Sequence, residues 1–302
     1  MAKGTGPAEQ AGGRRAIDLR FCVAAVMNAT DRTVAADASA AALDIAARTL
    51  RVTADAILSC EPIKHGLTNE SWLVRTRQDD VVVRISNTAE QALQIDRQSE
   101  ALVLAAVDEA GIGPQVILCD PAQRVLITRY LGDTWTEADA VQEENIQRLG
   151  QLFRRLHRIT PPPGVRRVEL NDTLEGYFRT LEERGIQPAL ITKSLRDRAL
   201  QVALKLRENS AATLCHNDVH HLNVTDDGKL RLIDWEYAGV GQRLFDLASV
   251  CVYHNYDKMQ REQLLSSYTA LTELTTWHRL ELACWLFDYV RDLWMAVRES
   301  GG

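Results

Sequence analysis

Short apolar runs separated by turn residues dominate the first half of the chain, and helical periodicity dominates the second half. Five runs rich in β-branched residues predict strands, at 57–64, 71–76, 81–86, 115–120 and 124–129. A helical pattern at 88–110 separates the third run from the fourth. Another helix is expected at 39–50. This order predicts a small β-rich unit with one helix between its third and fourth strands.

Beyond residue 138 the apolar positions recur every three or four residues. One helix face is formed by Ile146, Leu149, Phe153 and Leu156. That helix ends before "TPPPG" at 160–164, and the last helix is expected at 278–298. A single short strand, "LRLIDW" at 230–235, interrupts the helices. The fold class is therefore α+β, with a small β-rich N-terminal lobe and a larger helical C-terminal lobe.

The expected division of the chain follows from these patterns. Residues 1–38 form an Ala/Gly-rich leader that we expect to be disordered, and 39–130 form the N-terminal lobe. Residues 131–302 form the C-terminal lobe, and 130–134 are the expected hinge. No apolar run approaches the roughly 18 residues of a membrane span.

Composition narrows the possible partners. The formal net charge of −6 argues against nucleic-acid binding, which needs a clustered basic surface, and suits a cationic small molecule. The 6 cysteines contain no CxxC pair, which is typical of free thiols in a reducing compartment. We therefore expect a cytoplasmic monomer or homodimer that binds neither nucleic acid nor membranes.

The segment "CHNDVHHLNV" at 215–224 concentrates polar side chains that can do chemistry. His216, Asp218 and Asn223 have the spacing H-x-D-x-x-x-x-N of a kinase catalytic loop, and Asp234 follows in "LIDW". Asp218 would be the catalytic base that takes the proton of a substrate hydroxyl. Asn223 and Asp234 would be hard oxygen ligands for Mg²⁺, and His216 a structural hydrogen-bonding residue. The sequence thus predicts phosphoryl transfer.

Two other interpretations of the same segment are weaker. Zinc would need Cys215, His216, His220 and His221, but a β-like run and a turn follow at once and would aim these ligands poorly. A polar turn without chemistry is the second alternative. Upstream residues favour the kinase interpretation over both.

A candidate ATP site precedes the catalytic loop. The segment "HGLTNESW" at 65–72 is a strand-turn-strand loop with small polar residues. Arg84 ends "VVVR", and Glu100 lies sixteen residues on in a predicted helix, where the two can pair. The candidate ATP-binding residues, from loop to hinge, are Gly66, Thr68, Asn69, Arg84, Glu100 and Tyr130.

Together, "GLTNESWLV", "CHNDVHHLNV", "LRLIDWEYAG" and "FDLA" resemble the choline/ethanolamine kinase and thiamine kinase branch of the aminoglycoside phosphotransferase-like superfamily. The resemblance covers roughly residues 57–298. It implies a two-lobed protein-kinase-like fold, the cofactors ATP and Mg²⁺, and transfer of phosphate to a small alcohol. It also implies that Asp246 in "FDLA" braces the catalytic loop.

Residues for the acceptor are expected on the last helix and after the metal aspartate. A quaternary ammonium group is recognised by aromatic faces, and the candidates are Tyr237, Trp285, Tyr289 and Trp294. The choline kinase-like pattern has two tryptophans three apart, but here Arg291 replaces the first. Choline or ethanolamine is the first expectation and thiamine the alternative; an aminoglycoside kinase or an inactive binding module is less favoured.

Overall fold

The computed structural model describes residues 29–63, 69–86, 92–187, 189–207, 213–269 and 274–301. The chain forms two compact units, residues 1–38 and residues 39–302. Helix α1 (Ala29–Leu50) contributes its residues from Ser39 onward to the second unit. Within the described ranges, no helix combines the length and apolarity that crossing a membrane requires.

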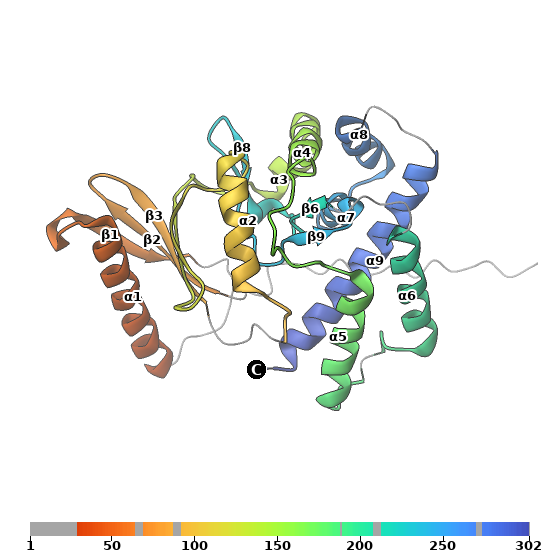
Figure 1. Ribbon diagram of the computed structural model, residues 1–302, viewed down its shortest axis with the longest axis horizontal. Coiled ribbons are helices and arrows are strands. Elements are labelled where there is room, and N and C mark those ends of the chain that lie inside the picture. The colour runs from red at the N-terminus through yellow and green to blue at the C-terminus, as the bar shows by residue number, and fades with distance from the viewer. Residues whose placement is uncertain are drawn as a thin grey trace, which may run out of the picture. The chain divides into compact units, whose positions relative to one another are not determined.

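The N-terminal part of the second unit is a five-stranded antiparallel sheet (Figure 1). Its strands follow the order β1-β2-β3-β5-β4. Their bounds are β1 (Ile57–Pro62), β2 (Asn69–Thr76), β3 (Asp80–Ser86), β4 (Val116–Asp120) and β5 (Val125–Arg129). Val81, Val83 and Ile127 are fully buried within this sheet. The five strands expected from the sequence are all present.

Helix α2 (Arg97–Glu109) stands beside the sheet in Figure 1 and buries Val103 and Val107. It is shorter than the expected helix at 88–110. The reason is a helix cap, because the side chain of Asp96 accepts a hydrogen bond from the backbone N–H of Ser99 at 3.0 Å. Residues 92–94 form a turn, and 87–91 lie outside the described residues.

Helices make up most of the C-terminal lobe. They are α3 (Glu137–Ala140), α4 (Glu143–Leu156), α5 (Leu170–Glu183), α6 (Lys193–Arg207), α7 (Arg243–Tyr253), α8 (Lys258–Tyr268) and α9 (Leu274–Glu299). The helix expected after residue 138 is divided into α3 and α4. Among the described residues the core of this lobe includes Ile146, Phe153 and Phe178. The α+β, two-lobed architecture predicted from the sequence is confirmed.

Two short antiparallel ribbons carry the polar loops of the C-terminal lobe. Strand β6 (Thr213–Cys215) pairs with β9 (Gly239–Gly241), and β7 (Val224–Asp226) pairs with β8 (Leu230–Leu232). Segment 216–223 connects the two ribbons and ends in the 3-10 helix η3 (His221–Asn223). The expected strand at 230–235 stops at Leu232. Both ends of the predicted catalytic loop are therefore fixed by backbone pairing.

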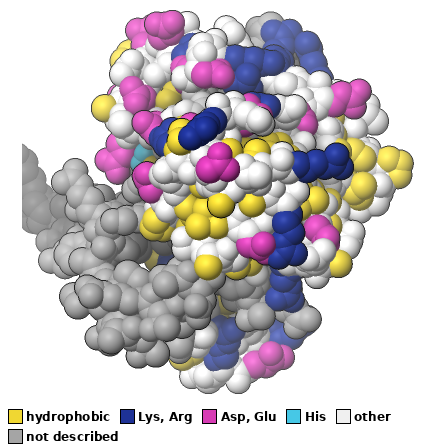
Figure 2. Space-filling model, turned by 90° about the vertical axis from the view of Figure 1, so that its left-hand side faces the viewer, with side chains coloured by type: hydrophobic (Ala, Val, Ile, Leu, Met, Phe, Trp, Pro, Cys, Tyr) yellow, Lys and Arg dark blue, Asp and Glu magenta, His cyan; other side chains and the backbone are white. Residues whose placement is uncertain are grey.

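Other helix bounds differ modestly from expectation. Helix α1 begins at Ala29 instead of 39, and α9 extends the predicted last helix at both ends. On the face drawn in Figure 2, basic and acidic side chains of the described residues are interspersed. The expectation that nucleic acid is not a partner stays a prediction.

Candidate functional site

Asp246, on α7, binds the backbone of the predicted catalytic loop. Its carboxylate accepts hydrogen bonds from the backbone N–H groups of His216 and Asn217, at 2.9 and 2.6 Å. Asn217 has φ 69°, a left-handed conformation that asparagine tolerates better than most residues. Asp246 is fully buried and also contacts Nε2 of His157 at 2.9 Å. These contacts are those that a brace of the loop requires.

His216 connects the catalytic loop to the segment that carries Asp234. Its Nδ1 accepts a hydrogen bond from the backbone N–H of Asp218, and its Nε2 lies 2.9 Å from the carbonyl oxygen of Ile233. This pattern requires the neutral imidazole with its proton on Nε2. Burial lowers the pKa of His216, which favours the same neutral form. His216 is thus a structural link, as its position in the motif suggested.

Asp218 presents a partly buried carboxylate between the loop and α7. Its Oδ1 accepts a hydrogen bond from the hydroxyl of Tyr253 at 2.9 Å, and its Oδ2 lies 3.9 Å from Nε2 of His220. Burial raises the pKa of Asp218 above its usual range, although His216 and the hydroxyl of Tyr253 oppose the shift. A carboxylate with a raised pKa is a better proton acceptor than an ordinary aspartate.

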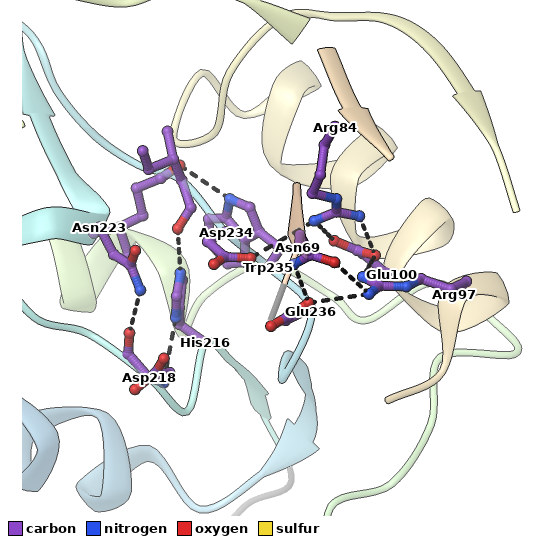
Figure 3. Close-up of polar contacts among 12 residues, drawn as sticks. Asn69, Arg84, Arg97, Glu100, His216, Asp218, Asn223, Asp234, Trp235 and Glu236 are labelled. Carbon is purple, nitrogen blue, oxygen red and sulfur yellow. Dashed lines mark hydrogen bonds and ion pairs between the residues drawn. The ribbon is translucent and has the colours of Figure 1, made fainter. Parts of the chain in front are cut away.

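Asn223 is fixed by three hydrogen bonds around η3. Its side-chain nitrogen donates to the carbonyl oxygen of Asp218 at 2.8 Å (Figure 3). Its backbone N–H donates to His220, and its carbonyl accepts from Ile233 at 3.0 Å. Because the amide nitrogen is turned to the loop, the amide oxygen is the atom that Asn223 can offer a cation.

Asp234 follows β8 in a conformation that is unusual for a residue with a side chain. Its φ is 61°, so the chain turns at this residue instead of continuing the strand expected there. Its Oδ1 is buried and accepts no hydrogen bond among the described residues, and the closest cation is Nη1 of Arg84 at 3.6 Å. Burial, followed by the charge of Glu236, raises the pKa of Asp234 well above its usual range.

These observations fit a hard divalent cation. Mg²⁺ prefers carboxylate and amide oxygens, and Asp234 and Asn223 offer one of each. A carboxylate oxygen that is buried without a hydrogen-bond donor is stabilised when a cation approaches it. Asn223 and Asp234 are therefore the residues that would hold the ion.

Glu100 is the best-paired carboxylate of the site. Arg84, on β3, donates two hydrogen bonds to it, both at 2.7 Å, and Arg97 donates a third at 2.7 Å. Burial alone would raise the pKa of Glu100, but the two guanidinium groups outweigh it and lower this pKa. The Arg84–Glu100 pair expected from the spacing of sixteen residues is present.

Arg97 extends this network to the C-terminal lobe through Glu236. Its Nη2 donates to the side-chain oxygen of Asn69 at 2.9 Å and lies 3.1 Å from Oε2 of Glu236. The side-chain nitrogen of Asn69 donates to the same oxygen at 2.7 Å. Figure 3 shows dashed lines that join Arg84, Glu100, Arg97, Asn69 and Glu236 into one network. Asn69 thus belongs to the charged network, and its contribution to ATP binding stays a prediction.

Two of these residues were not identified from the sequence. Arg97 and Glu236 are separated by 139 positions, and neither belongs to the catalytic-loop spacing. The available signal was the place of Glu236 two residues after Asp234 in "IDWEYAG". Glu236 is 2% exposed in the structure. A buried carboxylate needs a cationic partner, which here is Arg97.

The remaining ATP-site candidates are less informative. Gly66 and Thr68 lie outside the described residues. Tyr130 directly follows β5 at the expected hinge, where its hydroxyl donates to Asp133 at 2.6 Å and the guanidinium of Arg75 lies 5.6 Å from its ring centroid. Its contribution to nucleotide binding stays a prediction.

Several aromatic side chains lie near Asp218 and the segment after β8. Tyr237 accepts a hydrogen bond at its hydroxyl from Nε1 of Trp294, at 2.9 Å. Burial and the charge of Glu236 raise the pKa of Tyr237 well above its usual range, so its phenol is neutral. Burial, and to a smaller extent the charge of Asp218, raises the pKa of Tyr177, on α5. Tyr177 and Tyr253 were missed because no motif marks them.

Trp285 and Tyr289 belong to a different surface of α9. Their rings stack at 5.7 Å, the guanidinium of Arg198 lies 4.1 Å from Trp285, and the hydroxyl of Tyr289 donates to Leu190. Trp285 and Trp294 are nine residues apart, which is two and a half helical turns and places them on opposite sides. Among the four predicted aromatics, the structure brings Tyr237 and Trp294 together and leaves Trp285 with Tyr289.

The zinc interpretation finds little geometric basis in the described chain. The group whose ligand atoms lie within 4.8 Å of one another combines Cys215 with His157 and Asp246, and omits His216, His220 and His221. Both ring nitrogens of His157 are already within hydrogen-bond distance of partners, Tyr268 at 3.0 Å and Asp246 at 2.9 Å. Asp246 is in turn occupied by the catalytic-loop backbone.

Comparison with known proteins gives a consistent picture. The model of the phosphotransferase enzyme family matches residues 59–283. Protein LicA of Haemophilus influenzae is 28% identical over 250 residues, covering 78% of this chain and 73% of LicA. Human ethanolamine kinase 2 is 27% identical over 197 residues, 61% of this chain and 50% of that protein. A thiamine kinase of Salmonella paratyphi B is 39% identical over 71 residues, 22% of this chain and 25% of that protein.

Solved structures share the fold. The choline kinase LicA from Streptococcus pneumoniae superimposes with a TM-score of 0.73 at 19% identity, covering 86% of this chain and 90% of that one. A choline/ethanolamine kinase family protein from Mesorhizobium loti has a TM-score of 0.69 at 25% identity, covering 86% and 87%. A LicA in complex with AMP has a TM-score of 0.70 at 21% identity, covering 86% and 90%. With the family model matching most of its length, this chain belongs to the phosphotransferase enzyme family and is a small-molecule kinase.

Proposed function

We propose that the protein transfers the γ-phosphate of ATP to the hydroxyl of a small cationic alcohol, with choline or ethanolamine as the first candidates. The observation that carries the proposal is the juxtaposition of Asp218 and Asp234 with the aromatic pair Tyr237 and Trp294. Asn217, next to Asp218, donates a side-chain hydrogen bond to the carbonyl oxygen of Tyr237 at 3.0 Å, and Nε2 of His216 lies 2.9 Å from the carbonyl oxygen of Ile233, next to Asp234. A base, a cation site and an aromatic surface are thus close together.

The phosphate side of the site is built from both lobes. Arg84 lies 3.6 Å from Oδ1 of Asp234, and Glu100 fixes the direction of its guanidinium group. An arginine fixed in this way can contact phosphate oxygens without losing much side-chain freedom. Mg²⁺, held by Asn223 and Asp234, would neutralise charge on the phosphates when bound.

Asp218 is the group that receives the acceptor's proton. Its Oδ1 is engaged by Tyr253, and its Oδ2 is the oxygen that can reach the substrate hydroxyl. As the acceptor oxygen attacks the γ-phosphorus, the proton passes to Asp218 and the electron pair of the broken P–O bond leaves with ADP. The position of Asp218 orients the acceptor as well as deprotonating it.

The aromatic side of the site suits a cationic alcohol. An ammonium or quaternary ammonium group is attracted to the faces of tryptophan and tyrosine. Tyr237 and Trp294 are held to each other by a hydrogen bond, so their rings keep a fixed relative position. Relatives named ethanolamine kinase and a fold neighbour named choline kinase support the same acceptor class.

Thiamine is the second candidate acceptor. It combines a primary hydroxyl with a positively charged thiazolium ring. Arg291 stands where the choline kinase-like pattern has a tryptophan, which removes one aromatic wall, and a thiamine kinase is similar to this chain over 71 residues. An inactive binding module has less support, because Asp218, Asn223 and Asp234 are all present. An aminoglycoside has less support because a polycation needs an acidic cluster, and "TLEGYFRTLEERG" at 173–185 mixes a few acids with arginines.

The test is a screen for ADP release with choline, ethanolamine, thiamine and an aminoglycoside, each with and without Mg²⁺. We expect one of the first three to stimulate ADP release, and only in the presence of Mg²⁺. Mass spectrometry of the product would show the added phosphate. Equal ADP release with and without every acceptor would contradict the proposal and favour a binding module.

A further inference from the structure

Tyr253 is the last residue of α7 and touches the predicted base directly. Its hydroxyl donates a hydrogen bond to Oδ1 of Asp218 at 2.9 Å. A phenol has one proton to donate, so the hydroxyl of Tyr253 cannot donate to a second acceptor while this hydrogen bond exists. The contact fixes the carboxylate plane of Asp218 through one oxygen and leaves the other oxygen for the acceptor.

Three neighbours fix the ring of Tyr253. His220 meets it edge to face at 4.9 Å, and Phe287 does so at 5.5 Å. The guanidinium of Arg291 lies over the ring, 5.7 Å from its centroid. Arg291 is itself held by Asp288 at 2.6 Å. Tyr253 therefore has little freedom to move its hydroxyl away from Asp218.

The cation over the ring distinguishes Tyr253 from Tyr237. An aromatic face that already carries a guanidinium group is poorly suited to a second cation, because the two positive charges would repel each other. Tyr237 has no guanidinium over its ring among its described contacts, whereas Trp294 has that of Arg298 at 5.7 Å from its ring centroid. The hydroxyl of Tyr237 accepts a hydrogen bond from Trp294 instead of donating to the base. The ring of Tyr237 can therefore bind the acceptor's cation, whereas the hydroxyl of Tyr253 binds the base, Asp218.

We propose that Tyr253 is a positioning residue for Asp218, and that Arg291 acts through it. Tyr253 holds Oδ1 of the base so that Oδ2 faces the acceptor hydroxyl. The positive charge of Arg291 polarises the phenol and strengthens the hydrogen bond that it donates. The inference rests on the proposed function, since it assigns a role in the transfer of phosphate to an alcohol.

The other groups around Asp218 have different tasks. On the loop itself, His216 binds the backbone of Asp218, and His220 packs on Tyr253. The remaining titratable neighbours, from α5, α7 and the segment after β8, are Tyr177, Asp246, Asp234 and Tyr237. Among these described groups, only Tyr253 donates a side-chain hydrogen bond to the carboxylate of Asp218.

The decisive variant is Tyr253→Phe, which removes the hydroxyl and keeps the ring. We expect kcat for the acceptor that the wild type uses to fall about 10- to 100-fold, the range typical of a mispositioned reacting group. KM for the acceptor and for ATP should stay within about twofold of wild type, because the variant retains the binding surfaces. Tyr256→Phe is the matched control. Its hydroxyl donates to the carbonyl oxygen of Ala140, away from the base, so kcat should be unchanged.

Arg291→Gln provides a second, independent variant that leaves the buried ring intact. We expect a drop in kcat of about threefold, corresponding to the lower end of cation–π energies. In the double variant with Tyr253→Phe, kcat should equal that of Tyr253→Phe alone, because Arg291 acts through the hydroxyl. This variant decides the question if Tyr253→Phe does not fold.

The outcomes separate the inference from the function on which it rests. Wild-type turnover combined with unchanged kcat in Tyr253→Phe would overturn the inference alone. A raised acceptor KM at unchanged kcat would do the same, because it would make Tyr253 part of the binding surface. If Tyr253→Phe does not fold, unchanged kcat in Arg291→Gln would overturn it. A wild type that phosphorylates none of the acceptors would overturn the proposed function together with the inference.

Discussion

Glu100 and Asp234 are both carboxylates in the interior of the site, but their surroundings differ. Glu100 receives three charge-assisted hydrogen bonds from Arg84 and Arg97. Asp234 has one oxygen that accepts no hydrogen bond among the described residues, and its closest cation is 3.6 Å away. The pKa of Glu100 is lowered, whereas that of Asp234 is raised. The described residues supply hydrogen-bond donors to both oxygens of Glu100, but none to Oδ1 of Asp234.

The difference indicates which charges serve folding and which serve function. A buried ion pair with matched hydrogen bonds holds the lobes in one arrangement, because removing either partner leaves a charge without compensation. A buried carboxylate oxygen without a hydrogen-bond donor costs stability, and the cost is reduced when a cation binds to it. Arg84 contacts both carboxylates and so connects the two regions.

The largest effect is expected at the base. Asp218→Asn should lower kcat about 10²- to 10⁴-fold, the usual contribution of general-base catalysis. Nucleotide binding should be nearly unchanged, since Asp218 contacts neither Arg84 nor Glu100 among the described residues. Steady-state kinetics and calorimetric ADP titration measure the two quantities. Full turnover in Asp218→Asn would show that another group takes the proton.

The paired region should respond through stability. Glu100→Gln leaves Arg84 and Arg97 without their shared carboxylate, and we expect the free energy of unfolding to fall by about 3–5 kcal/mol. Urea unfolding of both proteins at neutral pH measures the difference. A loss below about 1 kcal/mol would mean that the Arg84–Glu100 pair contributes little, as most exposed pairs do.

The same pair gives a pH dependence with a definite sign. Because the pKa of Glu100 is lowered in the fold, its contribution is present above the ordinary glutamate pKa of about 4.3 and is lost as the pH falls further. The stability difference between wild type and Glu100→Gln should therefore shrink in acid. Urea unfolding at pH 7 and near pH 4 would detect the convergence. A difference that grows in acid would contradict the assigned pairing.

Asp234→Asn should act in the opposite direction from Glu100→Gln. Asparagine tolerates the left-handed backbone at this position and removes the charge from a group whose Oδ1 accepts no hydrogen bond among the described residues, so the metal-free protein should melt at the same or a higher temperature. Its Mg²⁺-dependent ADP affinity should fall about 10- to 100-fold, as for the loss of other ligand-sphere groups. A variant that is less stable and still binds Mg²⁺·ADP normally would remove the distinction between the two carboxylates.

The smallest effect compares Trp294 and Trp285, two tryptophans of α9. Trp294→Leu removes the group that donates to the hydroxyl of Tyr237 and fixes its ring, and we expect the acceptor KM to rise about 3- to 30-fold, the span of cation–π energies at Tyr237. Trp285→Leu should leave this KM unchanged, because Trp285 packs on Arg198. The reverse result would favour the sequence-based assignment of Trp285 and Tyr289 to the acceptor site.

The sequence predicted the parts of the site that lie close together along the chain. The spacing of His216, Asp218 and Asn223 sufficed for the loop, and sixteen residues connected Arg84 to Glu100. The succession of strands and helices along the chain followed from periodicity and turn residues, but a helix end depended on one capping side chain, Asp96. Local patterns carry this information because they report local geometry.

Contacts that join distant segments were not predictable in the same way. Tyr253 lies 35 residues from Asp218, and Arg97 lies 139 residues from Glu236, so only the folded chain brings them together. The separation of Trp285 from Trp294 follows from the sequence alone, since nine residues correspond to two and a half turns of helix. The loop residues Gly66 and Thr68 remain predictions from their motif.

The most direct test of the central claim is a crystal structure with Mg²⁺ and a non-hydrolysable ATP analogue. We predict that the side-chain oxygens of Asn223 and Asp234 bind one ion at about 2.0–2.1 Å, with Arg84 on the phosphates and Oδ2 of Asp218 facing the γ-phosphate. An ion held by other residues, or a triphosphate that ends beyond the reach of Asp218, would contradict the account.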